Sequence, residues 1–295
     1  MDWLTSFPNM DDDSLRALKK AIDEGFRNFT RAYGDAIESF FDPLQYFLIQ
    51  SERIMTQTPW PIIVLVIAGI AWLASRNWKF VPGTIITLLL IGYFGMWEDT
   101  MKTISIIFVS TVLSIVFGIP IGILMAKSNW VQRLVNPVLD VMQTMPSFVY
   151  LIPVVMLLGI GKVPGLIAVV IYAIPPIIRL TNLGIRMVDP DMLEAADAFG
   201  SSNWQRLKNV QMPLALPTIM AGINQTIMMA LAMVVIASMI GVQGLGQPVL
   251  KAISNQYFTL GMFNGLAIVG IAIIFDRVSQ AYGKRLQKHL EVVHG

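Results

Sequence analysis

Three aromatic side chains stand in apolar stretches where a binding site could form: Phe148, Tyr150 and Tyr172. The face of an aromatic ring attracts cations, and cages of such rings bind quaternary ammonium groups. Aromatic residues also gather where a membrane meets water, and such a belt accounts for the three equally well. Both interpretations stay open, and we treat these residues as candidates for a ligand pathway.

A second candidate set is a run of three polar residues, Asn224, Gln225 and Thr226, at the start of a long apolar stretch. Polar side chains in such stretches usually hydrogen-bond to neighbouring helices. They could also line a pathway for a polar ligand, and we carry them as candidates for that role.

Catalytic and metal chemistry find little support in the sequence. The chain has no Cys and two His, both in the C-terminal tail, and no Ser/His/Asp or Cys/His set lies among the apolar stretches. We therefore predict no catalytic residue, no metal site and no cofactor bound by this chain. Asp140 and Asp276 stand near the ends of apolar stretches, where caps or ion pairs are expected.

Composition places these candidates in a membrane protein. Of the 295 residues, 55% are hydrophobic and 14% are charged, against about 25% charged in soluble domains. A polytopic membrane protein fits these values, and the net charge of +2 gives no argument for nucleic acid as a partner. No basic, apolar and small-residue pattern opens the chain, so no cleaved signal peptide is expected.

Seven apolar segments approach or exceed the roughly 20 residues that cross a bilayer. They lie at 60–75, 80–97, 101–125, 137–160, 164–183, 215–241 and 260–280. Residues 1–58 form an acidic region in which apolar residues recur every three or four positions, as in an amphipathic helix, with Asp42-Pro43 as the candidate break. That helix could lie on the bilayer surface or pack against the spans.

Lys and Arg residues predict the orientation, because cytoplasmic loops are enriched in both. If the polar segment 189–213 is inside, the segments on its side carry twelve Lys or Arg residues and the opposite loops carry three. This predicts a periplasmic region 1–58 and a cytoplasmic tail 283–295.

The segment 189–213 carries the signals of two short helices between two apolar runs. They are an N-cap and first-turn Pro at Asp189-Pro190, a helix stop at Gly200, a capping box at Ser202 and Gln205, and dividing prolines at Pro213 and Pro217. We expect two helices with a tight bend, presented to the cytoplasm, where another protein could contact them.

The same segment resembles the EAA loop of ABC importer permeases at five positions: Glu194, Ala195, Ala196, Gly200 and Pro213. Val210 and Met212 stand where that pattern usually shows Ile and Leu, which are mild departures. The resemblance implies that the five residues couple this chain to a cytoplasmic ATPase.

Further stretches resemble the glycine betaine/proline subfamily of these permeases. They are QTMPSFVYLIP at 143–153, IPPIIRLT at 174–181, PTIMAGINQT at 217–226, VIASMI at 235–240 and GLGQ at 244–247. The likeness covers residues 95–282, whereas the N-terminal region matches only in kind.

This resemblance implies an all-α, polytopic protein with a five-helix type I permease core at 99–282, after two accessory transmembrane helices at 59–98. It also implies partners in a bacterial inner membrane: a second permease copy, an extracytoplasmic substrate-binding protein, and ATPase subunits that hold ATP and Mg. Gly161-Lys162 lacks the earlier Gly of a nucleotide-binding loop, which agrees with ATP on another chain.

The cargo that the resemblance implies is glycine betaine or a related quaternary ammonium compound, an osmoprotectant. Choline, carnitine, proline and trimethylamine N-oxide stay open as alternatives, because the binding protein makes much of the selection. A secondary transporter is a further alternative, and it would need ionisable residues in the middle of its spans.

Overall fold

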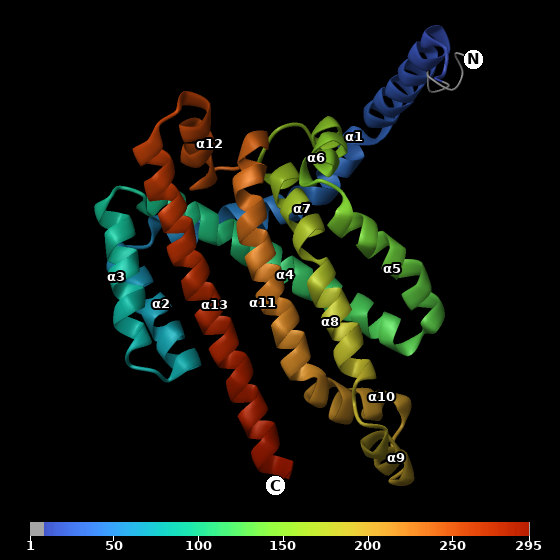
Figure 1. Ribbon diagram of the computed structural model, residues 1–295, viewed down its shortest axis with the longest axis vertical. Helices are drawn as coiled ribbons and strands as arrows, with labels where there is room; N and C mark the ends of the chain where they lie inside the picture. The colour runs from blue at the N-terminus through green and yellow to red at the C-terminus, as the bar shows by residue number, and fades with distance from the viewer. Residues whose placement is uncertain (1–8, 295) are drawn as a thin grey trace, which may run out of the picture.

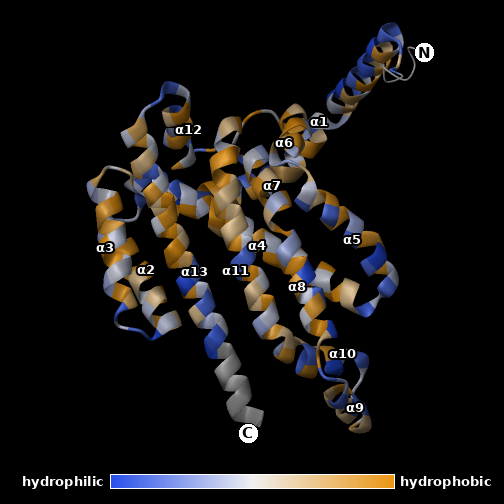
Figure 2. Ribbon diagram, viewed as in Figure 1, coloured by the Kyte–Doolittle hydropathy of each residue, from blue (hydrophilic) through white to orange (hydrophobic). Residues whose placement is uncertain are grey.

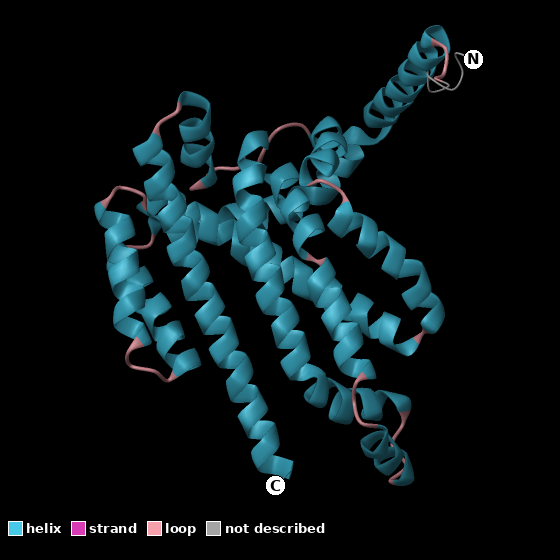
Figure 3. Cartoon of the chain, viewed as in Figure 1, coloured by secondary structure: helices cyan, strands magenta, loops and turns pink. Residues whose placement is uncertain are grey.

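The computed structural model describes the backbone of residues 9–294 and the side chains up to residue 285, and every regular element in this range is helical (Figure 3). The elements are α1 Asp12–Gln57, α2 Trp60–Ser75, α3 Phe80–Tyr93, α4 Trp97–Lys127, α5 Asn129–Thr144, α6 Ser147–Leu158, α7 Lys162–Ala173, α8 Pro175–Arg186, α9 Pro190–Ala198, α10 Asn203–Arg206, the π-helical segment η2 Leu207–Gln211, α11 Met212–Ala237, the 3₁₀ turn η3 Ser238–Ile240, α12 Gly246–Asn255 and α13 Phe258–His294. The expected all-α class is confirmed.

Within the described residues, four continuous helical stretches are long and apolar enough to cross a membrane. They are Trp97–Lys127, Lys162–Arg186, Asn203–Ile240 and Phe258–Arg285. Two bent pairs, α1 with α2 and α5 with α6, raise the number to six, and α3 is a shorter apolar helix. Each of the seven predicted segments overlaps a helix or a bent helix pair, and apolar residues dominate α2, α3, α11 and the first part of α13 (Figure 2). The protein is therefore a multi-pass membrane protein.

The segment predicted at 80–97 ends early. The helix α3 stops at Tyr93, and α4 begins at Trp97, four residues before the span expected at 101–125. Between them Gly95 has a φ of +76°, a left-handed conformation that glycine adopts readily. The segment at 60–75, by contrast, coincides with α2.

The segment predicted to span the membrane at 137–160 is divided into two helices. The chain turns by 100° between α5 and α6. Pro146 lacks a donor and disfavours the helical conformation in the residue before it, and Met145 is extended, with φ −69° and ψ 131°. The helix therefore ends at Thr144 and a new one starts at Ser147.

The prediction that Pro213 and Pro217 divide a short helix from the next span was wrong. Helical structure runs without a break from Asn203 to Ile240. The hydrogen bonds before Pro213 are π-helical, as from the Met212 N–H to the Leu207 carbonyl, and the helix continues through this proline. Pro217 is tolerated inside α11.

The N-terminal helix α1 continues through Pro43, so the candidate break at that residue is not a break. Its first half projects away from the other helices (Figure 1). Its second half packs against the bundle: Leu48 and Ser51 are buried, and Glu52 binds Lys162 at the start of α7 with Oε–Nζ distances of 2.8 and 2.7 Å. The acidic region is thus joined to the rest of the protein by an ion pair.

The helix α8 lies between α4 and α11, and glycines allow the backbones to approach closely. A Cβ at Gly122 of α4 would lie 2.6 Å from the Cβ of Thr181 and 2.8 Å from the carbonyl oxygen of Ile178. A Cβ at Gly222 of α11 would lie 3.1 Å from the Cα of Ile177. Small residues at such contacts are typical of helix packing in membranes, where association depends on close contact. The three helices are therefore packed as one unit.

Candidate functional site

The segment 189–213 lies at one end of the bundle, beyond the ends of α8 and α11 (Figure 1). Its first helix, α9, starts as predicted: the Asp189 side chain accepts a hydrogen bond from the Asp191 N–H at 3.0 Å, and Pro190 is the first helical residue. It ends at Ala198, and two residues later Gly200 has a φ of +76°. Nothing lies within 4 Å of a Cβ built at Gly200, so the backbone conformation, and not space within this chain, favours glycine there.

The second helix begins with the predicted capping box. The Ser202 hydroxyl accepts from the Gln205 N–H at 3.3 Å, and the Gln205 side chain accepts from the Ser202 N–H at 2.8 Å. Arg206 then reaches back to Asp197 of α9, with an Nη1–Oδ2 distance of 2.7 Å. The ion pair links the two short helices of what we call the unit 189–213, and the buried Leu207 packs in a cluster with Ile185 of α8 and Ala215 of α11.

The five residues of the EAA-like pattern are not equally accessible. Glu194, Ala195 and Gly200 are exposed, Pro213 is half-buried, and Ala196 is buried. Glu194 and Ala195 therefore belong to a surface that a partner could touch, whereas Ala196 packs inside this chain.

Two aromatic residues of the same unit are exposed, and the sequence reasoning did not assign them a role. Phe199 is 91% exposed and Trp204 is 65% exposed. The Lys127 ammonium, at the end of α4, lies 5.8 Å from the centroid of the Trp204 ring. The signal was present in the sequence, because bulky aromatic residues are unusual in a polar stretch between two apolar runs.

The unit is tied to the ends of three long helices. It leaves from α8 and returns to α11, which approach each other where a Cβ at Gly184 would lie 3.0 Å from the Cβ of Thr218. Arg186, at the end of α8, donates from Nη2 to the Met125 carbonyl of α4 at 2.8 Å and from Nε to Asn182 at 3.0 Å. These contacts connect the unit with α4, α8 and α11.

The three candidate aromatic residues differ in exposure, and Tyr150 and Tyr172 belong to the same apolar cluster. Phe148 on α6 is exposed, Tyr150 on the same helix is buried, and Tyr172 on the adjacent α7 is half-buried. The Tyr150 hydroxyl has no hydrogen-bond partner among the described residues. A buried, unpaired hydroxyl is unusual, so Tyr150 keeps its place as a candidate for polar contact.

The polar run at 224–226 separates into three environments. Asn224 donates to Asp276 of α13 at 3.0 Å and accepts from the hydroxyl of Ser279. Thr226 is fully buried, and Gln225 is exposed. Asn224 thus links α11 to α13, and Gln225 is the member that faces outward. The second candidate acid, Asp140, forms the expected ion pair, with an Arg179 Nη2–Oδ1 distance of 2.5 Å.

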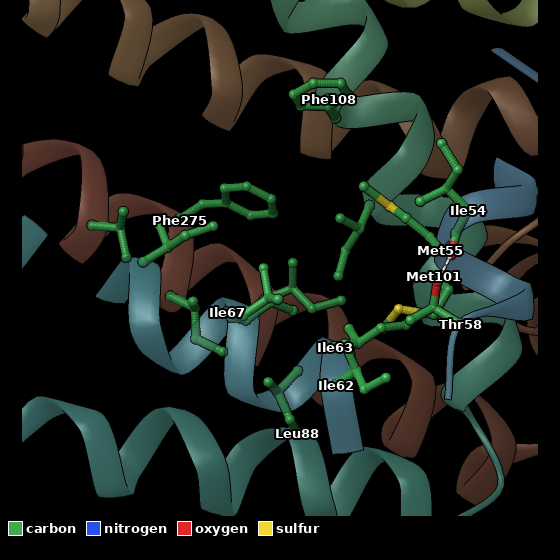
Figure 4. A pocket seen from close by; sticks show the side chains of 16 residues that line it. Ile54, Met55, Thr58, Ile62, Ile63, Ile67, Leu88, Met101, Phe108 and Phe275 are labelled. Atoms are coloured by element: carbon green, nitrogen blue, oxygen red, sulfur yellow. Dashed lines mark hydrogen bonds between the residues drawn. The ribbon is translucent and has the colours of Figure 1, made fainter. Parts of the chain in front are cut away.

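An apolar cavity of about 360 Å³ lies among α1, α2, α3, α4 and α13 (Figure 4). Thr58 is the polar residue of its lining, and its hydroxyl is already bonded to the Ile54 carbonyl at 2.5 Å. A charged or zwitterionic solute would find no partner there, because burying an unpaired charge is costly. Among the described residues, no group of three or more His, Cys, Asp and Glu side chains is placed to hold a metal ion.

Residues 118–288 match the family model described as binding-protein-dependent transport system inner membrane component. The glycine betaine/carnitine transport permease protein GbuB of Listeria monocytogenes is 50% identical over 77% of this chain and 81% of its own length. The glycine betaine/proline betaine permease protein ProW of Escherichia coli is 43% identical over 96% of this chain and 82% of its own. The glycine betaine permease protein OpuAB of Bacillus subtilis is 47% identical over 89% and 93%.

Among solved structures, the MetNI methionine ABC transporter in an inward-facing conformation is similar to this chain. The TM-score is 0.58 at 20% sequence identity, and the match covers 63% of this chain and 93% of the solved chain. This likeness shows a shared fold.

Proposed function

We propose an import function for this chain, which belongs to the family of inner membrane components of binding-protein-dependent transport systems. It is a multi-pass permease with the fold of an ABC importer permease. The proposed cargo is glycine betaine or a related quaternary ammonium compound, because relatives that are 43–50% identical carry that cargo in their names.

The proposed assembly contains two copies of this chain, two cytoplasmic ATPase subunits and an external substrate-binding protein. ATP and Mg are bound and hydrolysed on the ATPase subunits. In this proposal the surface of the unit 189–213, with Glu194, Ala195 and Phe199, contacts an ATPase, and Gly200 and Pro213 position it.

The observation that carries the proposal is the way this unit is built. It is an exposed pair of helices, closed by its own caps and the Arg206–Asp197 ion pair, and joined rigidly to α8 and α11. Such a unit is suited to transmit the movement of an ATPase subunit to α8 and α11 while keeping its own shape. The helices that receive the push also carry or adjoin the candidate pathway residues.

In the proposed cycle, the unit follows the ATPase surface that it contacts, and α4, α8 and α11 move with it. Their movement opens the pathway to the outside, where the binding protein delivers the solute, and the return movement opens it to the cytoplasm. Direction comes from ATP, so this cycle requires no ionisable group at mid-membrane. A secondary transporter, by contrast, would need such ionisable groups in its spans.

Carnitine and trimethylamine N-oxide are the alternatives with independent support. More distant relatives named for these cargoes are 34% identical over 61% of this chain and 32% identical over 98% of it. All these solutes share a methylated ammonium, a weakly hydrated cation suited to aromatic faces. Choline and proline are the remaining alternatives.

Uptake into proteoliposomes that contain this permease, its ATPase and its binding protein tests the proposal. In vesicles whose ATPase subunits face the lumen, we expect labelled glycine betaine to accumulate in the lumen when ATP is enclosed there. A non-hydrolysable ATP analogue should not support accumulation. Unlabelled quaternary ammonium compounds should compete, whereas glutamate and maltose should not.

Two results would contradict the proposal in different ways. Accumulation without any ATPase would make the chain a secondary transporter. Stronger competition by an anion or a sugar would overturn the cargo and leave the ATP-driven importer in place.

A further inference from the structure

A basic pocket of about 460 Å³ lies where α2, the turn after it, α3 and α13 meet at one end of the bundle. Its lining consists of Ser75, Asn77, Lys79, Phe80, Arg277, Gln280, Ala281 and Lys284. The lining thus holds three cations and three neutral polar side chains, and within the described chain it contains no acidic residue. Its lining includes no residue of the unit 189–213, and Gln280 donates at 2.7 Å to Asp276 Oδ1, the same oxygen that accepts from Asn224 of α11.

The pocket is held in shape by hydrogen bonds. In the turn between α2 and α3, Ser75 accepts from the Asn77 N–H at 3.2 Å, and Asn77 accepts from the Lys79 N–H at 2.9 Å. Arg285 of α13 donates to the Leu73 carbonyl at 3.0 Å and so joins α13 to the end of α2. The cations of the pocket make no ion pair with the described residues.

Apolar surface leads from the membrane to this pocket along two helices. On α13, the exposed residues follow a spacing of three and four that continues into the basic residues: Met262, Leu266, Val269, Ile273, Arg277, Gln280 and Lys284. Residues at this spacing share one face of a helix. On α3, exposed Ile86 and Leu90 share a face with Lys79 in the same way. Each face is therefore apolar over the span and basic at its end.

We propose that this pocket binds the phosphate of an anionic phospholipid, whose acyl chains lie on the apolar faces of α3 and α13. A phosphate oxygen forms short, strong hydrogen bonds with Arg and Lys. The side-chain amide of Asn77 supplies two neutral donor hydrogens beside them, and that of Gln280 supplies one, because its other hydrogen is bonded to Asp276. Basic pockets between transmembrane helices on the cytoplasmic side suit such head groups. The predicted orientation puts this pocket in the cytoplasmic leaflet, and the proposal does not depend on the cargo.

Native mass spectrometry of the purified transporter complex tests this proposal. The complex is incubated with equal amounts of phosphatidylglycerol and phosphatidylethanolamine, and the bound lipids are counted. We expect phosphatidylglycerol to be retained, and the variant Lys79→Gln/Arg277→Gln/Lys284→Gln to lose affinity by about fivefold for each cation removed. The matched control Lys19→Gln/Lys20→Gln/Arg133→Gln removes the same charge elsewhere and should bind as the original does.

Three results would overturn the proposal. Equal loss in the matched control would mean that overall positive charge, and not this pocket, attracts the lipid. Displacement of the lipid by inorganic phosphate or glycerol phosphate would mean a site for a soluble anion. Should the triple variant fail to assemble, the single variant Lys79→Gln decides, since its side chain is exposed, and unchanged binding would refute the site.

Discussion

Gly200 could be needed for its left-handed backbone conformation or for its small size, and substitutions can distinguish these two reasons. Its φ of +76° is costly for residues with a Cβ by roughly 1–2 kcal/mol, but Asn tolerates it better than others. Open space surrounds the position within this chain. We therefore predict that Gly200→Asn keeps most of the uptake, whereas the β-branched Gly200→Val loses it. Uptake, corrected for the amount of permease in the membrane, checks this.

The pair of variants also identifies which surface needs the glycine. If Asn is as damaging as Val, the backbone is not the reason, and a partner must approach the α-carbon closely. If both variants transport normally, the unit is not the coupling contact.

Residue features that depend on near neighbours could be predicted from the sequence, and others could not. The cap at Asp189 and the box at Ser202 and Gln205 involve partners two or three positions away, so the sequence contains them. The bond from Arg186 to the Met125 carbonyl joins residues 61 positions apart. No local pattern specifies that pairing, because it arises only when α4 and α8 pack together.

At the scale of elements, proline had two opposite effects that its presence alone does not distinguish. Pro146 follows the end of α5, because a proline disfavours the helical conformation in the residue before it, and Met145 is extended. Pro213 follows a π-helical turn and falls at the start of α11, so helical structure continues. The outcome depends on the hydrogen bonds of the preceding turn, which the sequence does not show directly.

The link between α11 and α13 gives a prediction at this scale. Asn224→Leu removes the 3.0 Å bond to Asp276 and one of the two acceptors of the Ser279 hydroxyl. Polar links of this kind in membranes contribute about 0.6 kcal/mol on average and at most about 1.7 kcal/mol. We expect a modest fall in the thermal unfolding temperature of the purified permease, measured in detergent.

Gln225→Leu is the matched control, because Gln225 is the next residue and is exposed. It should leave the unfolding temperature unchanged. A drop in uptake with unchanged stability would favour the pathway role for Gln225, whereas equal destabilisation by both variants would contradict the structural role of Asn224.

At the scale of the whole molecule, composition and the EAA-like pattern predicted the class, but the sequence left open whether α1 lies on the bilayer surface or packs against the spans. Its packing rests on Glu52 and Lys162, which are 110 positions apart. The predicted orientation agrees with this pair, because it places both region 1–58 and the loop that precedes α7 outside. The distribution of Lys and Arg and the Glu52–Lys162 ion pair thus agree in placing region 1–58 and the start of α7 on one side of the membrane. This placement requires the bent pair α5–α6 to cross the bilayer.

Single-cysteine labelling determines on which side of the membrane each loop lies, and the absence of native Cys gives a clean background. With a membrane-impermeant reagent, we predict that Cys at positions 20 and 161 is labelled from outside, and Cys at 133 and 208 only from inside. All four sites should accept Cys: Lys20, Arg133 and Lys208 are exposed, and a Cβ at Gly161 approaches no atom closer than 4.0 Å.

Each position tests one crossing. Position 161 decides whether α5 and α6 form a broken span, because labelling from inside would make the pair a re-entrant loop with both ends in the cytoplasm. Position 20 decides whether α2, which has 16 residues and meets α1 at 107°, crosses the bilayer. Labelling of both positions from inside would place Glu52 and Lys162 on the cytoplasmic side. The orientation predicted from the twelve-to-three distribution of Lys and Arg would then be wrong for these two segments.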